Sequence, residues 1–196
     1  MSDPEPLSPA ERRSALRRIG LVVGAGAFAA PLVVNAVHPA ALASARFGSL
    51  PAALATLARF RNEAVQMSGA WDWPHVLHHV AQSVEYSMTG FPAVRPAWFR
   101  ATLGRYAFAL FNAGGQMTHG LDEAIPGAPS LAQGLAVGPA ADRLIAALQA
   151  FDRYTGDLSP HFAYGTLDKP AYTRAHLMHI ANHWQQVVQD PSKETS

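Results

Sequence analysis

The sequence contains no cysteine among its 196 residues. This absence excludes disulfide bonds, thiolate metal sites and a cysteine nucleophile. Charged residues make up only 15% of the chain, and 15 Lys and Arg nearly balance 14 Asp and Glu. The chain therefore offers neither a basic surface for nucleic acid nor an acidic tail. Its length is that of a single domain.

Alternating apolar and polar residues, the pattern of half-buried strands, are also lacking. Apolar residues recur instead every three or four positions, which predicts an all-α fold. The core helices are expected at Leu50–Val65, Asp72–Met88, Pro139–Tyr154 and Lys169–Gln189. Another helix is expected over 96–112, followed by an ordered, Gly- and Pro-rich excursion over 117–139 that crosses one end of the bundle.

The first 45 residues have the features of an export signal. Arg12 and Arg13 precede a mildly apolar stretch at 19–37, and small residues follow. This order is typical of the twin-arginine route and predicts a periplasmic or otherwise exported protein. The expected cleavage sites follow Ala43 and Ala45. The alternative is an inner-membrane anchor formed by residues 19–37, because about 19 apolar residues can just cross a bilayer.

Histidines gather in two of the predicted core helices. The last helix carries His179 and His183 one turn apart, about 6 Å along the axis, where two imidazoles can share one cation. In the second helix, His75 and His79 have the same spacing. Spacing alone leaves three alternatives open. These are a closed site of all four imidazoles, a set in which His176 replaces His183, and histidines that merely face solvent.

Three stretches together resemble one protein family. The segment from Trp71 to Glu85 resembles the Trp-start, His-Leu-Ala-Gln-Ser segment of DinB-like proteins. The remaining matches are to an uncharacterised branch of that superfamily. They comprise His161-Phe-Ala-Tyr-Gly165, His179-x-x-x-His183-x-x-Gln186, Met117-Thr-His119-Gly and Pro126-Gly-Ala-Pro129. The chain departs from the branch pattern at three positions, Thr118, Phe162 and Asn182, of which Asn182 is not expected to touch the ligands.

The resemblance implies a DinB-like four-helix bundle of up-down-down-up type, with the extra helix and the excursion between core helices 2 and 3. It also implies an open metal site formed by His79, His179 and His183. Imidazole ligands suit zinc or nickel, the two cations expected here. The residues expected around the pocket, outside the ligand set, are His119, His161, His176, Gln82 and Gln186.

These features predict a targeting segment at 1–45, the bundle at 46–190 and a disordered tail at 191–196. Three histidines with an open position are typical of catalytic metal sites. The expected function is therefore an exported metal-dependent enzyme, a hydrolase or a transferase, that acts on an unknown small molecule. DinB-like relatives include thiol-dependent transferases, but low-molecular-weight thiols are scarce outside the cytoplasm, so export favours activated water.

The alternatives are a non-catalytic metal- or small-ligand-binding protein and a plain helical bundle. No nucleic-acid partner is expected, nor stable membrane insertion once the signal is cleaved, and a homodimer is compatible with the sequence. No general base is evident. Glu85 lies about 120° around its helix from His79, and Asp122, Glu123 and Tyr164 fall in predicted loops.

Overall fold

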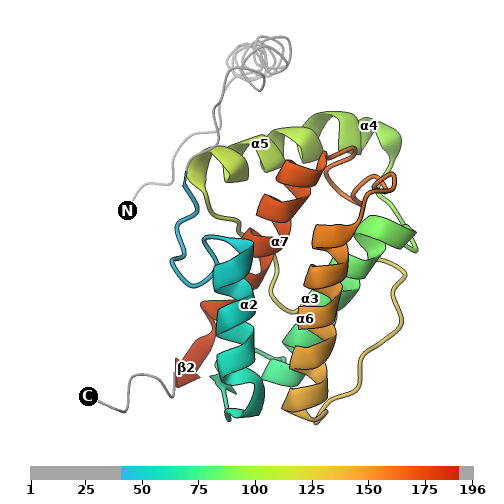
Figure 1. The fold of residues 1–196 in the computed structure, drawn as a ribbon. Coiled ribbons are helices and arrows are strands. Elements are labelled where there is room, and N and C mark those ends of the chain that lie inside the picture. Colours follow the sequence, from blue (N-terminus) through green and yellow to red (C-terminus); the bar gives the residue numbers. More distant parts are fainter. Residues whose placement is uncertain (1–40, 190–196) are drawn as a thin grey trace, which may run out of the picture. The chain divides into compact units, whose positions relative to one another are not determined.

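The computed structural model describes residues 41–189. Four helices form the body of the bundle (Figure 1): α2 (Leu50–Arg59), α3 (Trp73–Thr89), α6 (Val137–Arg153) and α7 (Lys169–Trp184). α3 packs along α6 and α7, and α2 packs on the same two helices. The predicted all-α fold class is confirmed. No helix among residues 41–189 is long and apolar enough to cross a membrane.

α3 and α7 begin in the same way. The side chains of Asp72 and Asp168 accept hydrogen bonds from the backbone N–H groups of His75 and Ala171, at 2.9 and 2.8 Å. A proline in the first turn of each helix lacks the N–H that would otherwise need a partner. α3 ends at Gly90, whose φ of 103° is a conformation that favours glycine. The capping aspartates and first-turn prolines therefore define where α3 and α7 begin, and both helices begin within one residue of the predicted positions.

Most of the predicted targeting segment lies outside the described residues, as does the predicted tail at 191–196. Residues 41–45 of that segment, however, contact the bundle. The backbone N–H of Ala43 donates to the carbonyl of Gly115 at 2.9 Å. Gly115 has φ 66°, and a side chain on it would overlap the carbonyl oxygen of Ala41. Nearby, Phe47 is fully buried, with its ring centroid 5.5 Å from that of Trp184.

The first and last core helices are shorter than predicted. α2 ends at Arg59 and continues as a single turn, η1 (Phe60–Asn62), while α7 ends at Trp184. The residues beyond them form two short antiparallel strands, β1 (Gln66–Met67) and β2 (Val187–Gln189). The N–H of Ser68 donates to the carbonyl of Gln186 at 2.8 Å. The backbone N–H and C=O groups after α2 and α7 therefore bond to each other across the two strands, instead of within longer helices.

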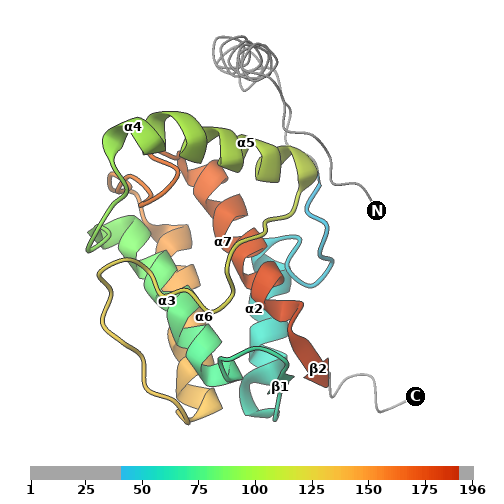
Figure 2. The same cartoon turned by 180° about the vertical axis from the view of Figure 1, so that it is seen from behind.

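The helix predicted over 96–112 is a composite. It consists of α4 (Ala97–Phe99), a π-helical turn η2 (Arg100–Gly104) and α5 (Arg105–Gly114), and it lies across one end of the bundle in both views (Figures 1 and 2). A Cβ atom on Gly104 would overlap the carbonyl oxygen of Ala163. Glycine therefore allows this segment to touch the backbone of the 161–165 loop, which carries His161.

The excursion after α5 runs along the side of the bundle, because α4 and α5 already cover the end that it was predicted to cross. Figure 2 shows it passing over α3 and α7 before it reaches the start of α6. The side-chain amide of Gln82 on α3 donates to the carbonyl of Pro129 at 3.4 Å. Asn182 on α7, with its amide oriented to satisfy both neighbours, donates to the Met117 carbonyl (3.1 Å) and accepts from the His119 N–H (3.3 Å). The excursion is thus held over the histidine-bearing faces.

Candidate metal centre

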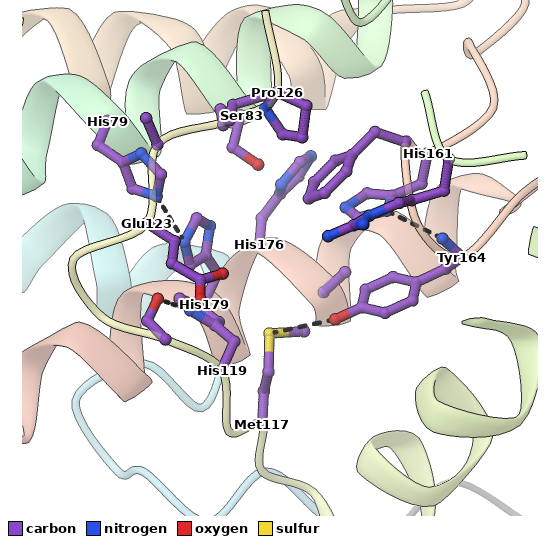
Figure 3. A pocket seen from close by; sticks show the side chains of 16 residues that line it. His79, Ser83, Met117, His119, Glu123, Pro126, His161, Tyr164, His176 and His179 are labelled. Atoms are coloured by element: carbon purple, nitrogen blue, oxygen red, sulfur yellow. Dashed lines mark hydrogen bonds between the residues drawn. The ribbon is translucent and has the colours of Figure 1, made fainter. Parts of the chain in front are cut away.

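α3 and α7 bring three of the histidines together. Nε2 of His179 lies 3.2 Å from Nε2 of His79 and 3.2 Å from Nε2 of His183. One ring nitrogen of each residue lies within 4.8 Å of the other two. Figure 3 shows His79 and His179 next to each other at one side of a pocket, and their rings are nearly perpendicular, with an interplanar angle of 85°. Within residues 41–189 this is the group of His, Asp or Glu side chains that could hold a metal ion.

All three imidazoles are held in the neutral form. Burial, reinforced by repulsion from neighbouring histidines, lowers the pKa of His79 to about 3 and that of His183 to about 2. The same causes hold the pKa of His179 well below its ordinary value. A neutral imidazole keeps a lone pair on one nitrogen, which is the form that binds a metal. The donor set therefore fits a metal ion that accepts nitrogen ligands.

His119 lies directly beside this group. Its ring centroid is 4.8 Å from that of His179 and 5.2 Å from that of His183. Its Nδ1 donates to the Gly120 carbonyl at 2.7 Å, so the ring proton is on Nδ1 and Nε2 keeps its lone pair. That Nε2 is buried and has no hydrogen-bond partner in the described part of the chain. His119 could therefore serve as a further nitrogen ligand or accept a hydrogen bond from a molecule in the pocket.

The other histidines of α3 lie outside the ligand group. His75 stacks on Trp71 with ring centroids 4.5 Å apart, and the same indole also packs on His79 at 4.9 Å. His78 lies on another face, with Nδ1 3.2 Å from the guanidinium of Arg143. That guanidinium also forms a 2.7 Å ion pair with Glu85. Because Glu85 is paired there, it is not available to the pocket as a base.

A cavity of about 150 Å³ opens beside His79 and His179 (Figure 3). Residues from α3, α7, the excursion and the 161–165 loop line it. Among them are His79, Ser83, Arg95, Met117, His119, Gly120, Glu123, His161, Tyr164, His176 and His179. Of the predicted surrounding residues, the structure thus places His119, His161 and His176 in the lining. Gln82 and Gln186 are not part of it, since Gln82 bonds to Pro129 and the amide of Gln186 packs against Gly69.

Sequence reasoning did not identify Glu123 and Arg95 as pocket residues. Figure 3 shows the Glu123 side chain beside His179 and His119. A Cβ atom on Gly120 would lie 2.7 Å from the Glu123 carboxylate, so glycine at 120 makes room for it. Both residues lie outside regular helices. Helical periodicity therefore could not orient them, and no local signal in the sequence could have placed them in the pocket.

His176 is also buried, but it packs against aromatic side chains and lies outside the group of three histidines. Its Nε2 lies 3.3 Å from Ser87 Oγ, and its ring packs against Phe151 and Tyr172, with centroids 4.9 and 5.4 Å away. Burial lowers the pKa of His176 to about 3. The folded chain therefore keeps this ring neutral at pH values where an unfolded chain would protonate it.

This difference predicts an acid-sensitive contribution to stability. The unfolded chain binds a proton on His176 near pH 6.5, whereas the folded chain does so only near pH 3. The contribution is fully present above pH 6.5 and is lost as the pH falls toward 3, by about 1.4 kcal/mol per pH unit. In the metal-free protein, His176→Leu should reduce the slope of unfolding free energy against pH by about that amount. Denaturant titrations at several pH values measure this slope, and equal slopes in the two proteins would refute the prediction.

Comparison with known protein families matches residues 40–190 to a family described as "Protein of unknown function (DUF1569)". The match covers the whole described bundle, including both histidine-bearing helices. Comparisons with curated proteins and with solved structures gave no match.

Proposed function

The chain belongs to the DUF1569 family, and from this premise we propose that it is an exported, metal-dependent enzyme with a DinB-like bundle. His79, His179 and His183 hold one zinc or nickel ion, and the adjoining cavity receives a small-molecule substrate. The observation that carries this proposal is the convergence of three neutral imidazoles with two Nε2–Nε2 distances of 3.2 Å, and two of the three, His79 and His179, line a cavity.

A divalent cation held in such a site acts as a Lewis acid and lowers the pKa of water. The chain's own side chains supply the remaining functions. Glu123 lines the cavity, where its carboxylate can serve as a general base. Nε2 of His119 is a free acceptor that can orient a hydroxyl or a water molecule. The apolar side chains of Met117 and Ile125 limit the access of bulk water. Hydrolysis of an ester-like bond, or group transfer, is the chemistry that this set supports.

Export is proposed from the Arg12-Arg13 pair ahead of the apolar stretch at 19–37. The twin-arginine route carries folded proteins, so the ion could be loaded before export. The periplasm is then the expected location, with an anchor formed by residues 19–37 as the alternative. Scarcity of low-molecular-weight thiols outside the cytoplasm favours the hydrolase over a thiol-dependent transferase.

The proposal is tested by comparing turnover of a panel of small esters, with and without added thiol, by the metal-loaded and the chelated protein. We expect hydrolysis that depends on zinc or nickel. Glu123→Gln should lower kcat by about 10²- to 10⁴-fold, the usual contribution of a general base, while the metal content stays unchanged. Asp122→Asn is the matched control, since it removes the neighbouring carboxylate, which is not in the cavity lining. Metal binding without turnover of any panel member would favour the non-catalytic binding protein.

A further inference from the structure

The ring of His161 is fixed in one tautomer by its own loop. Its Nδ1 accepts hydrogen bonds from the backbone N–H groups of Ala163 and Tyr164, at 3.1 and 3.2 Å. A nitrogen that accepts in this way carries no proton, so the ring proton of the neutral imidazole is on Nε2. His161 is only 7% exposed and lines the cavity. Its Nε2–H has no hydrogen-bond partner among residues 41–189.

Aromatic packing fixes the orientation of this donor. The ring of Tyr164 stacks on the His161 imidazole with centroids 4.3 Å apart and an interplanar angle of 6°. Phe162 and Phe91 pack on it as well, at 4.5 and 5.1 Å. The backbone closes the turn through a 2.8 Å bond from the His161 N–H to the carbonyl of Gly165. Such a preorganised N–H group binds an acceptor oxygen without the cost of reorienting the ring.

Arg95 provides a positive charge in the same cavity lining. Its position is coupled to the His161 loop, because the N–H of Arg95 donates to the Phe162 carbonyl at 2.8 Å. The carbonyl of Arg95 in turn accepts from the side chain of Arg100 at 3.0 Å. Within the described part of the chain, no carboxylate forms an ion pair with the Arg95 guanidinium. The Arg95 guanidinium lies 5.9 Å from the centroid of the Phe99 ring, a contact that leaves its charge unneutralised, and it shares the cavity lining with the neutral N–H donor of His161.

Once a divalent cation is bound, the charges in the cavity favour an anion. Arg95 and Glu123 are the charged side chains of the lining, and the lining histidines have lowered pKa values. Their two charges cancel, so a bound divalent cation would make the cavity net positive. A carboxylate presents two acceptor oxygens, one for the Arg95 guanidinium and one for Nε2–H of His161. A cavity of about 150 Å³ is large enough for a ligand the size of benzene.

We propose that the cavity is a subsite for a small monocarboxylate, whose oxygens accept hydrogen bonds from the Arg95 guanidinium and from Nε2–H of His161. The inference deepens the proposed function and rests on it, since the substrate is then a small carboxylic acid derivative whose other end faces the three histidines. Arg95 and His161 act here as residues that recognise and position the substrate.

Benzoate, with its neutral isostere benzamide, provides the probe for calorimetric titration of the metal-loaded protein. We expect benzoate to bind and benzamide to bind at least about tenfold more weakly, the usual difference for hydrogen bonds to a charged group. Arg95→Gln should weaken benzoate binding about tenfold, whereas Arg105→Gln, an equal change of charge outside the cavity lining, should leave it unchanged. His161→Asn keeps an acceptor for the loop but removes the Nε2–H, and it should weaken binding about fivefold.

Titrations with and without the metal separate this inference from the metal proposal. The same titrations on chelated protein show whether the effect of Arg95→Gln persists without the ion. If it persists in a protein that binds no metal, the carboxylate subsite stands and the metal proposal fails. If metal binds but neither Arg95→Gln nor His161→Asn alters benzoate affinity, the subsite is refuted and the metal proposal stands. Tighter binding of inorganic phosphate than of benzoate also refutes it, as would ¹⁵N NMR showing the His161 proton on Nδ1.

Discussion

His79→Ala is expected to abolish the binding of divalent metal. Of the three grouped histidines only His79 lies outside α7, so its loss leaves the group with two imidazoles on one helix face. Two ligands one turn apart give a chelate with much weaker affinity than three converging ones. The loss should exceed the roughly 10- to 100-fold cost of removing a hydrogen-bond partner of a ligand. Metal analysis after purification without refolding measures it directly.

Histidines on the same two helices supply matched controls. His179→Ala and His183→Ala should lose the metal as His79→Ala does. His75→Ala and His78→Ala, on the same helix as His79, should retain it, and so should His176→Ala on α7. Circular dichroism of each variant separates loss of the ion from loss of the fold. A folded His79→Ala protein with its full metal content would overturn the assignment.

Gly104→Ala is expected to cause the largest loss of stability among glycine substitutions in the helical segments. The added Cβ atom would overlap the carbonyl oxygen of Ala163, a backbone atom that moves only if the 161–165 loop or the whole α4–α5 segment moves. Overpacking of this kind typically costs about 1–3 kcal/mol, occasionally more. The free energy of unfolding, from denaturant titration of the chelated protein, measures the cost without any contribution from a bound ion.

The control for this substitution lies ten residues further along the same segment. A Cβ atom on Gly114 would meet one neighbouring atom, the Gln116 side chain, at an ordinary 4.0 Å. Gly114→Ala should therefore leave stability unchanged or raise it by up to about 1 kcal/mol, the helix preference of alanine over glycine. Similar losses in both variants would show that the contact between Gly104 and Ala163 is not what makes glycine necessary at 104.

The parts of the fold that were predicted correctly depend on local chemistry. Asp72 and Pro74 define the start of α3 because an N-cap and a first-turn proline act within one helical turn. The pairing of Gln66 with Gln189 could not be predicted in this way, since two short strands more than a hundred residues apart carry no periodic signal. The π-helical turn at 100–104 was missed for a related reason, because it accommodates a contact with a distant loop.

The residues of the candidate site were likewise predictable from spacing where they lie in helices and unpredictable from it where they lie in loops. Helical spacing limited the ligands to a few histidines of two helices but left several sets open, and the family resemblance pointed to His79, His179 and His183, which the structure brings together. Asn182 had been expected only to avoid the ligands, yet it holds the backbone of His119 from α7. Loop residues such as Arg95 had no predictable orientation. Their place in the cavity follows from tertiary contacts rather than from any local pattern.

A metal titration of the chelated protein tests the central claim most directly. Zinc or nickel should bind with one equivalent per chain, and X-ray absorption of the zinc complex should show imidazole nitrogens at about 2.0–2.1 Å, the usual zinc–nitrogen distance. The His79→Ala, His179→Ala and His183→Ala proteins should show no such equivalent. Absence of stoichiometric binding by the folded wild-type domain, or a zinc complex without imidazole ligands, would contradict the account.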